Sequence, residues 1–379
     1  MILLLTPFFS PNIGGVETHL NDLCDYLNKN NRRVSVLTYV PITEAIKAKR
    51  RETYGNLEIR RFWWPGSNLF HKFERFPPIF NCVYLVPGLL VRSLFFMLKN
   101  NQQVEVIHSQ GLASGLAGVV LKLIFQKRLV ISTHAIYGLR KGTLFSKTSA
   151  AVLNMADKVL ALSYTSKKEL LEFGVKDNKV MVYTYWVNQR IFKPMNKKRC
   201  KKALGLENKF VVLFVGRMIE LKGTDILLAI AKREPKINFV FVGTGPCEES
   251  VELASLENKN VKFVGKVENK DLPVFYNAAD ILAVPSKYEE GFGRVILEAL
   301  SCGTPVVGSN KGSIPEAVSD KVGILVSPDE RSFRKAIKCL FWDRKKLKEL
   351  AEGCRSYAVA KFSQKNASLI MKSYYDSRE

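Results

Sequence analysis

The residues best suited to chemistry lie in one stretch, residues 285–316, which contains two carboxylates and several glycines. Glu290 and Glu298 are separated by seven residues, and a glycine lies on each side of Phe292 between them. Glycine adopts backbone conformations that other residues avoid, so this segment predicts a tight loop. Residues 295–300 then have the apolar spacing of a helix. The N–H groups at the start of such a helix, together with its dipole, favour a bound anion such as a phosphate.

The two carboxylates need a different kind of ligand group. Glu290 is expected in the loop and Glu298 one to two turns into the helix, so both can face one cavity from different heights. Carboxylates beside an anion site would repel the anion unless they bind hydroxyl groups. A sugar nucleotide carries phosphates together with the hydroxyls of its ribose and hexose. The alternative is a strand, loop and helix with a solvated pair of carboxylates, which explains the glycines but not the combination.

The same stretch resembles the signature of family 4 of the retaining glycosyltransferases. In that signature two glutamates separated by seven residues precede a Gly-Thr-Pro-Val-Val strand and a glycine-containing loop that ends in Pro-Glu. Here these are Glu290, Glu298, Gly303–Val307 and Gly312–Glu316. The resemblance covers nearly the whole chain and is most specific over residues 216–316. It implies an α/β fold of GT-B architecture, with two doubly wound, Rossmann-like parallel-sheet domains facing a deep cleft.

A pair of cations precedes this stretch in the sequence. Residues 210–215 predict a strand that ends at Gly216 and Arg217, and Lys222 and Gly223 follow. Cations at the point where a strand gives way to a loop would meet a diphosphate, although on spacing alone they could equally be solvated. The four residues resemble the family's Gly-Arg and Lys-Gly element. This resemblance implies that both cations stabilise a departing diphosphate.

The resemblance also implies a role for each residue of the site. Glu290 would orient the sugar, Glu298 would bind the ribose, and the departing phosphate would take the acceptor proton, so no general base is expected. No Asp-x-Asp pair occurs in the chain, so a metal bridge to the diphosphate is not expected. The resemblance implies no cofactor and a UDP- or GDP-sugar as the donor. The residues expected to act in catalysis are Arg217, Lys222, Glu290 and His134. The residues expected to bind the donor are Gly14, Gly15, Gly216, Phe292, Gly293, Arg294, Val295 and Glu298.

A second strand, glycine loop and helix opens the chain. Residues 1–6 are apolar, Gly14 and Gly15 follow two prolines, and residues 16–27 have helical spacing. This arrangement is a candidate phosphate cradle, but a Gly-Gly turn between a strand and a helix is common. The family carries a Gly-Gly loop followed by Val-Glu at this point. This likeness implies that the loop contacts the donor phosphates or the reacting sugar.

Two of the four histidines follow predicted strands. His108 ends the strand predicted at 104–108, and His134 follows the strand predicted at 129–133. In a doubly wound parallel sheet, ligands gather at the carboxyl ends of the strands. Histidine is often structural, and the sequence leaves the role of His108 open. The resemblance implies that His134 contacts the donor sugar, although the aspartate that often follows in the family is Ala135 here.

The expected domains are an acceptor-binding domain, 1–190, and a nucleotide-sugar-binding domain, 191–362. The polar, basic tract 193–202 is the expected linker. The resemblance implies that the last helix, about 363–379, returns to the first domain. The family usually has Asn-Gly-Val-Asp where this chain has Tyr185–Asn188, so contacts near the linker are expected to differ.

The charge of the chain predicts a polyanionic partner. Its 379 residues, 47% of them hydrophobic, carry a net charge of +23 at a pI near 9.7, and both halves have an excess of basic residues. Such a chain should be attracted to nucleic acid, to an anionic membrane or to phosphorylated substrates. Residues 76–156 have the most one-sided charge of any segment, with eight basic residues and one acidic residue, Glu105.

Two segments could meet a membrane. Residues 83–98 are apolar with Arg92 in the middle, and they predict a buried or interfacial helix rather than a spanning one. Basic residues alternate with aromatic ones over 47–76, which suits a membrane interface or single-stranded nucleic acid unless the aromatics simply lie in the core. No nucleic-acid recognition motif occurs, so an anionic membrane is the expected partner. The residues concerned are Lys47, Lys49, Arg50, Arg51, Arg60, Arg61, Phe62, Trp63, Trp64, Phe70, Phe73 and Phe76.

The expected function is that of a retaining glycosyltransferase. It would move a hexose of the mannose, glucose or N-acetylglucosamine type from a nucleoside-diphosphate sugar to a membrane-associated lipid or glycan acceptor. The seven cysteines contain no Cys-x-x-Cys pair, which favours a reduced, cytoplasmic setting, peripheral on the inner face of the cell membrane. The alternatives are a GT-B sugar-nucleotide epimerase, which should lack the Glu290 to Glu298 signature, and a non-catalytic basic protein that binds membranes or nucleic acid.

Overall fold

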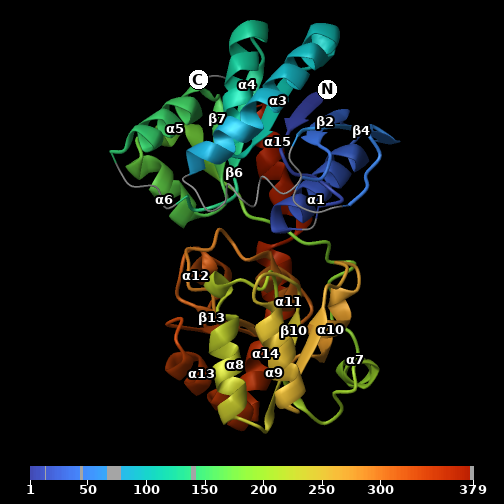
Figure 1. Cartoon of the computed structure of the whole chain (residues 1–379), viewed down its shortest axis with the longest axis vertical. Coiled ribbons are helices and arrows are strands. Elements are labelled where there is room, and N and C mark those ends of the chain that lie inside the picture. Colours follow the sequence, from blue (N-terminus) through green and yellow to red (C-terminus); the bar gives the residue numbers. More distant parts are fainter. Residues whose placement is uncertain (13, 43–45, 66–77, 138–141, 376–379) are drawn as a thin grey trace. The chain divides into compact units, whose positions relative to one another are not determined.

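The computed structural model divides into two units by its internal contacts (Figure 1). Unit 1 consists of Met1–Tyr185 and Gln364–Glu379, and unit 2 consists of Trp186–Ser363. The boundary between Tyr185 and Trp186 falls a few residues before the one expected from the sequence. The residues that the structure describes are 1–12, 14–42, 46–65, 78–137 and 142–375.

Unit 1 is built around an eight-stranded sheet whose described strands pair in parallel, except that β3 and β4 are antiparallel. The central strands are buried on both faces and therefore read as continuous apolar runs in the sequence. In spatial order the strands are β3 (Arg51–Tyr54), β4 (Leu57–Phe62), β2 (Val34–Tyr39), β1 (Ile2–Leu5), β5 (Val106–Gln110), β6 (Arg128–Thr133), β7 (Lys158–Ala161) and β8 (Val180–Val182).

Helices connect these strands and cover the sheet (Figure 1). Two of them begin with side-chain caps, because Thr143 accepts a hydrogen bond from the Ser146 N–H and Ser163 accepts one from the Ser166 N–H. The described α-helices of unit 1 are α1 (Gly15–Lys29), α3 (Pro78–Asn100), α4 (Gly111–Phe125), α5 (Leu144–Met155), α6 (Tyr164–Glu172) and α15 (Ala367–Tyr375). Met155 ends α5, and β7 begins at Lys158.

Unit 2 contains a six-stranded sheet in which all described pairs are parallel. In spatial order its strands are β11 (Val261–Gly265), β10 (Ile237–Val242), β9 (Phe210–Val215), β12 (Ile281–Val284), β13 (Val306–Ser309) and β14 (Gly323–Val326). Its helices are α7 (Lys197–Ala203), α8 (Thr224–Arg233), α9 (Glu248–Glu257), α10 (Leu272–Ala278), α11 (Arg294–Ser301), α12 (Ile314–Ala317), α13 (Glu330–Trp342) and α14 (Arg344–Lys361).

The tract expected to be a linker, 193–202, is instead a docked part of unit 2. Its helix α7 is held by Lys201, whose Nζ lies 2.7 Å from a carboxylate oxygen of Asp280. The same carboxylate accepts a hydrogen bond from the Val211 N–H at 2.8 Å. The Met195 N–H donates to Asn277 Oδ1 at 2.6 Å. A basic tract can therefore be structural where a buried carboxylate receives it.

The last helix, α15, belongs to unit 1, and His108 holds it there. His108 Nδ1 lies 2.7 Å from the Tyr374 hydroxyl, and Nε2 lies 2.7 Å from Ser132 Oγ. The ring is fully buried, and burial lowers the pKa of His108 to about 3. Its role, which the sequence left open, is that of a neutral structural bridge between β5, β6 and α15.

In the basic and aromatic stretch 47–76, Lys47, Lys49, Arg50 and Arg51 are exposed, whereas two of the described aromatic rings pack inward. The rings of Phe62 and Tyr39 pack edge to face at 4.7 Å, and Trp64 packs against Tyr39 at 5.6 Å, whereas Trp63 is exposed. Arg61 is buried. Several of these residues are thus core, which was the alternative interpretation of the pattern. Phe70, Phe73 and Phe76 lie outside the described residues.

Candidate functional site

The residues singled out by the sequence form two groups, one in each unit. In unit 2 they follow β9 and β12, which are neighbours in the sheet, so the loops after both strands lie at one edge. In unit 1 they lie around the carboxyl ends of β5 and β6 and the start of α1. The first group is centred on a carboxylate and the second on a histidine.

Glu290 is the centre of the group in unit 2. The Lys222 ammonium forms an ion pair with Glu290 Oε1, and the Ser286 hydroxyl donates to Oε2 at 2.5 Å. Burial would lower the pKa of Lys222, but the charges of Glu290 and the nearby Tyr288 hold it above its ordinary value. Lys222 is therefore a permanent cation, and Glu290 is a fixed carboxylate that keeps further lone pairs for a ligand.

Glycines bring the backbone of two other loops against this carboxylate. Gly312 has φ +55°, and a Cβ there would lie 2.4 Å from the backbone N of Glu290. The Ser313 N–H donates to the Glu290 carbonyl at 2.9 Å. Gly223 has φ +72°, and a Cβ there would lie 2.2 Å from the carbonyl oxygen of Pro285. Both positions therefore require glycine. The contact at Gly312 fixes the backbone of Glu290, and the contact at Gly223 fixes the loop that carries Lys222.

Glu298 lies deeper, on α11, and is 2% exposed. Its Oε2 accepts from the Tyr276 hydroxyl at 2.8 Å, while Oε1 accepts from Asn269 Nδ2 at 3.2 Å and from Arg294 Nε at 3.1 Å. Burial raises the pKa of Glu298 despite these donors. A carboxylate has about four accepting positions, so this one has about one left for a ligand hydroxyl.

The start of α11 offers its backbone rather than its side chains. Gly293 has φ +64° and caps the helix, as a left-handed position before a helix requires. The Phe292 ring is buried edge to face on Phe362 at 5.9 Å, and Arg294 donates to the Trp186 carbonyl at 3.1 Å. Both side chains were expected among the donor-binding residues, but they are turned into unit 2. The groups that can meet a phosphate are the N–H groups of the first turn, which includes the half-exposed Val295.

Gly216 and Arg217 end β9 at the same edge of the sheet. Gly216 lies against the next loop, since a Cβ on Gly243 would be 2.0 Å from the Gly216 carbonyl oxygen. The following Met218 N–H donates to the Thr244 carbonyl at 2.8 Å. The Arg217 side chain is exposed between these anchored neighbours. A fixed backbone thus carries a long, exposed cation.

His134 is the centre of the group in unit 1. Its Nδ1 lies 2.8 Å from the Tyr185 hydroxyl and its Nε2 lies 2.7 Å from Gln110 Oε1. Burial lowers the pKa of His134 to about 4, so the ring is neutral at neutral pH. If the Gln110 oxygen accepts, Nε2 carries the proton and Nδ1 accepts from Tyr185. Both nitrogens are then used, and a sugar would meet the ring edge or the Tyr185 and Gln110 groups that hold it.

Gly14 and Gly15 begin α1, beside this cluster. His19, one turn into α1, stacks on Tyr185 at 4.2 Å and lies 6.0 Å from the ring of His134. A Cβ on Gly14 would lie 2.2 Å from Oε2 of Glu17, so a carboxylate occupies the start of this helix. A carboxylate at this position would oppose a phosphate. The loop is better suited to sugar hydroxyls than to the donor phosphates, and these were the two possibilities that the resemblance allowed.

Several residues that complete the two groups were not predicted from the sequence. In unit 2 they are Ser286, Asn269 and Tyr276, and in unit 1 they are Gln110, His19 and Tyr185. Tyr185 lies in the segment where the chain departs from the family pattern, and that departure was the one available signal. The hydroxyl and amide partners carry no motif of their own and become visible only when distant strands meet.

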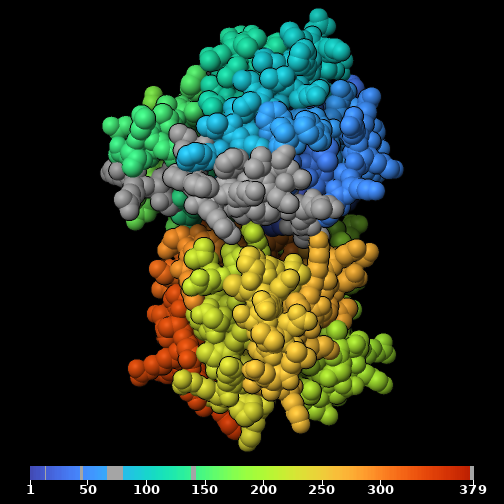
Figure 2. All heavy atoms as spheres, viewed as in Figure 1, coloured from blue at the N-terminus to red at the C-terminus, as the bar shows by residue number. Residues whose placement is uncertain are grey.

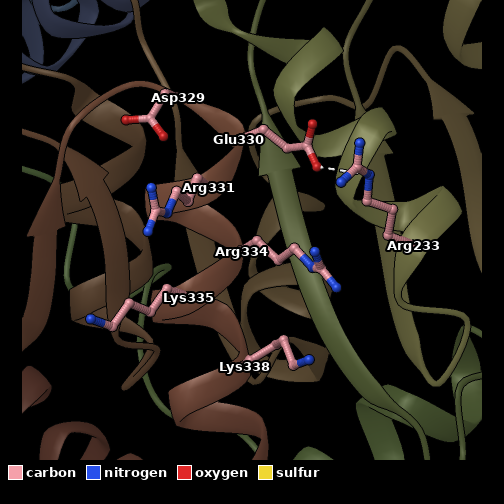
Figure 3. A pocket seen from close by; sticks show the side chains of 7 residues that line it. All are labelled: Arg233, Asp329, Glu330, Arg331, Arg334, Lys335 and Lys338. Atoms are coloured by element: carbon pink, nitrogen blue, oxygen red, sulfur yellow. Dashed lines mark ion pairs between the residues drawn. The ribbon is translucent and has the colours of Figure 1, made fainter.

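A basic depression on unit 2 is separate from these groups in the sequence and in its contacts (Figure 3). Glu234 accepts ion pairs from Arg334 at 2.7 Å and Lys338 at 3.2 Å, and Glu330 accepts one from Arg233 at 3.0 Å. Arg331 and Lys335 lie on the same helix, α13, and are exposed. The depression is an exposed network of ion pairs with an excess of cations. Among the residues that the structure describes, no group of three or more His, Cys, Asp or Glu side chains is arranged to hold a metal ion.

Comparison with protein families matches both units. The model described as Glycosyl transferases group 1 matches residues 196–357, and the model described as Glycosyltransferase Family 4 matches residues 13–188. Among curated relatives, the chain is similar to the GPI3 subunit of phosphatidylinositol N-acetylglucosaminyltransferase of Saccharomyces cerevisiae. The two are 25% identical over 336 residues, which cover 85% of this chain and 71% of the relative.

Comparison with solved structures gives the same fold. Sucrose-phosphate synthase of Thermosynechococcus elongatus superposes with a TM-score of 0.83 at 23% identity, covering 99% of this chain and 98% of that one. Anabaena Alr3699/HepE in complex with UDP-glucose superposes with a TM-score of 0.75 at 21% identity, covering 98% of this chain and 97% of that one. The chain therefore has the α/β fold of two mostly parallel sheets known as GT-B.

Proposed function

Because the chain belongs to the group 1, family 4 glycosyltransferases, we propose that it transfers a hexose from a nucleoside-diphosphate sugar to a membrane-associated lipid or glycan acceptor. The transfer is proposed to retain the configuration of the anomeric carbon. The donor is proposed to be a UDP- or GDP-sugar. The transfer is proposed to take place at a membrane surface that faces the cytoplasm.

One observation carries this proposal, namely the ion pair of Lys222 and Glu290 beside the start of α11. A permanent cation, a fixed carboxylate and the N–H groups of a helix start lie on loops that glycine contacts lock together. The cation and the helix start suit a diphosphate, whereas the carboxylate suits the hydroxyls of the attached sugar. Few ligands other than a sugar nucleotide need both in one place.

The residues of unit 2 are proposed to act on the leaving group. Lys222, the helix start at Gly293 and the exposed Arg217 would bind the negative charge that builds on the diphosphate when its bond to the sugar breaks. The acceptor oxygen would bond to the anomeric carbon on the same face, and the acceptor proton would pass to the departing phosphate oxygen. Glu290 would orient the sugar, and the last accepting position of Glu298 would take a ribose hydroxyl.

The residues of unit 1 are proposed to recognise hydroxyl groups without adding positive charge. The neutral His134 cluster offers an imidazole edge, a phenol and an amide, and the start of α1 offers the Glu17 carboxylate. These groups suit a hexose. Because this group offers no cation, the negative charge of the leaving group is proposed to be stabilised by unit 2.

The relatives' names support the classes of donor and acceptor. The yeast phosphatidylinositol N-acetylglucosaminyltransferase is named for a hexosamine and a lipid acceptor, and Alr3699/HepE was solved with UDP-glucose. The net charge of +23 also suits a protein that works beside anionic lipid. We therefore favour a UDP-hexose or UDP-N-acetylhexosamine and a phosphate-bearing lipid acceptor.

A donor panel tests the proposal. The full chain is mixed with UDP- and GDP-sugars, binding is scored by thermal shift, and nucleoside-diphosphate release is then measured with and without a lipid extract. We expect one donor to stabilise the chain and release to depend on the lipid, with NMR of the product giving a retained configuration. Lipid-independent release of an epimerised free sugar would identify an epimerase instead. Failure of every donor to bind would remove the proposal.

A further inference from the structure

The outer face of α3 carries exposed apolar side chains that the proposed chemistry does not use. Val83, Val91, Phe95 and Leu98 are all exposed, Phe95 by 61% and Leu98 by 70%. At about 100° per residue these positions fall within roughly 120° of the helix circumference. They form one stripe along α3. The helix α4 packs beside α3 and adds Leu116, Leu123 and Ile124.

These seven residues are here named the α3–α4 apolar face. Figure 2 shows that the atoms of α3 and α4, in cyan to blue-green, form an outer surface of unit 1. Monomeric soluble proteins seldom expose large contiguous apolar patches, and such patches mark contacts with a partner or a membrane.

The charges around the α3–α4 apolar face are almost all positive. Residues 78–137 contain one acidic residue, Glu105, and its carboxylate is 2.7 Å from the amino group of Met1. Asp157 also reaches α4, but its carboxylate is paired with Lys122 at 2.7 Å. Apolar side chains flanked by an excess of cations match the interface of an anionic bilayer. A protein partner of ordinary composition would be a poorer match in charge. The cations on or just after the two helices include Arg92, Lys99 and Lys127.

Length alone does not decide how α3 meets a membrane. Residues Phe80–Gln103 are long and apolar enough to cross a bilayer, with a mean hydropathy of 1.6, but a third of that window is buried inside the protein. The Tyr39 hydroxyl of β2 donates to the Leu85 carbonyl and accepts from the Leu89 N–H at 2.9 Å. These are the two groups that bond to each other in an uninterrupted helix. A side chain of the sheet is therefore inserted into the backbone of α3.

Gly88 makes this insertion possible. A Cβ at Gly88 would lie 2.6 Å from the Tyr39 hydroxyl and 2.6 Å from the Trp64 ring, and Trp64 Nε1 donates to the Tyr84 carbonyl at 3.0 Å. The inner face of α3 is thus fixed to unit 1 through β2 and Trp64. Only the outer face remains for a partner, which excludes a helix that leaves the domain to span the bilayer.

We propose that the α3–α4 apolar face docks unit 1 on an anionic lipid bilayer. In this arrangement α3 lies in the plane of the interface, its apolar side chains among the acyl chains and Arg92, Lys99 and Lys127 at the headgroup phosphates. The inference rests on the proposed function only for the reason to dock, which is to reach a lipid acceptor. The docking itself requires no sugar. Of the two segments that the sequence offered for membrane contact, the inference favours residues 83–98, which lie on α3, over the stretch 47–76.

Vesicle binding of the full chain tests the inference. Co-sedimentation with vesicles of phosphatidylcholine and phosphatidylglycerol is compared for a Phe95→Glu, Leu98→Glu double variant and for a Leu253→Glu, Leu256→Glu variant on α9, where Leu256 is 81% exposed. We expect the α3 variant to lose at least tenfold in partitioning and the α9 variant to match the unsubstituted chain. Thermal stabilisation by the nucleotide sugar should be the same in all three. If the nucleotide sugar stabilises neither the unsubstituted chain nor the two variants, the proposed function is contradicted, but the docking result still stands.

A fluorescent reporter tests the inference without relying on a loss of binding, which a misfolded variant would also show. Phe95→Trp places an interfacial reporter on α3, and its fluorescence should shift to the blue and be quenched by brominated lipid when vesicles are added. Leu256→Trp on α9 is the matched control and should not change. An unshifted Trp at residue 95 on vesicles that still bind the chain would overturn the inference.

Two further outcomes would replace the bilayer with another explanation. If Arg331→Glu and Lys335→Glu on α13 abolish binding while the α3 variant binds normally, attachment is electrostatic and lies on unit 2. If light scattering without lipid shows a dimer that the α3 variant converts to a monomer, a second copy of the chain covers the α3–α4 apolar face. Either result would refute docking through α3 and α4.

Discussion

The Glu290 site of unit 2 and the His134 cluster of unit 1 both lie at the carboxyl ends of parallel strands, but they are built differently. Glu290 is charged and is held by backbone contacts, through Gly312 and through the loop of Gly223. His134 is neutral and is held by side chains, Tyr185 and Gln110. A buried charge needs a rigid setting and a counter-ion, whereas a neutral cluster needs only matched donors and acceptors. The backbone contacts around Glu290 require glycines at fixed positions, which form a motif in the sequence. The side chains around His134 form no such motif.

Removal of the counter-ion should give the largest effect. Lys222→Ala is expected to lower turnover about a hundredfold or more, because a preorganised cation that stabilises the leaving group is lost. It also leaves the buried Glu290 carboxylate beside Ser286 without its ion pair. Turnover with the donor identified in the panel is the measurement.

Lys287→Ala is the matched control for this experiment. Lys287 lies in the loop that carries Glu290, and its Nζ is 2.7 Å from the exposed carboxylate of Asp225. Exposed pairs contribute about 0–1 kcal/mol, so activity should change little. Equal losses in both variants would mean that the loop, and not the Lys222 charge, is what matters.

A methyl group at Gly312 should have the next largest effect. Gly312→Ala puts a Cβ 2.4 Å from the Glu290 backbone at a φ of +55°, so one of the two loops must move. We expect turnover to fall about ten- to a hundredfold and donor affinity to weaken, with the cost of the strained backbone about 1–3 kcal/mol. Gly205→Ala, with φ +67° and open space around it, separates backbone strain from the contact. Equal activity of Gly312→Ala and the unsubstituted chain would show that Glu290 is held by other means.

The two constructions explain how far the sequence could be interpreted. The alternation of apolar runs and helical segments predicted both parallel sheets, and the glycines with the two glutamates predicted the loop between β12 and α11. Tyr276 and Asn269 could not be predicted, because their bonds to Glu298 join elements that meet only in the folded sheet. The sequence predicts a linker where helix α7 docks, since a basic tract looks solvated until the buried Asp280 is known.

A fall in pH should lower the free energy of unfolding of unit 1 but not that of unit 2. All four histidines of the sequence precede Tyr185, and the pKa values of His108 and His134 are lowered to about 3 and about 4 by burial. Between these values and the ordinary value near 6.5, the unfolded chain binds protons that the folded unit does not, so stability falls as the pH falls. Each histidine costs about 1.4 kcal/mol per pH unit in this range. Burial raises the pKa of Glu298, so this residue of unit 2 acts in the opposite direction.

Hydrogen exchange followed by mass spectrometry measures the two units in one sample. Between pH 7 and pH 5, peptides of unit 1 should lose protection by about 2 kcal/mol per histidine after correction for intrinsic rates, while peptides from β9 to β13 should not. A His108→Gln variant should have a shallower pH dependence in unit 1. Parallel loss in both units would contradict the assignment of the acid response to the histidines.

The smallest effect is expected where the neutral cluster loses one hydroxyl. Tyr185→Phe keeps the ring that stacks on His19 at 4.2 Å but removes the donor to His134 Nδ1 at 2.8 Å. A neutral hydrogen bond contributes about 0.5–1.5 kcal/mol, so turnover should fall by about threefold to tenfold. The imidazole should also become free to change tautomer, which nitrogen-15 NMR of the histidine ring can detect. Tyr183→Phe is the matched control, because its hydroxyl is 3.4 Å from the same nitrogen and should matter less. A loss on the scale of Lys222→Ala would mean that unit 1 also stabilises charge, and the contrast between the two constructions would disappear.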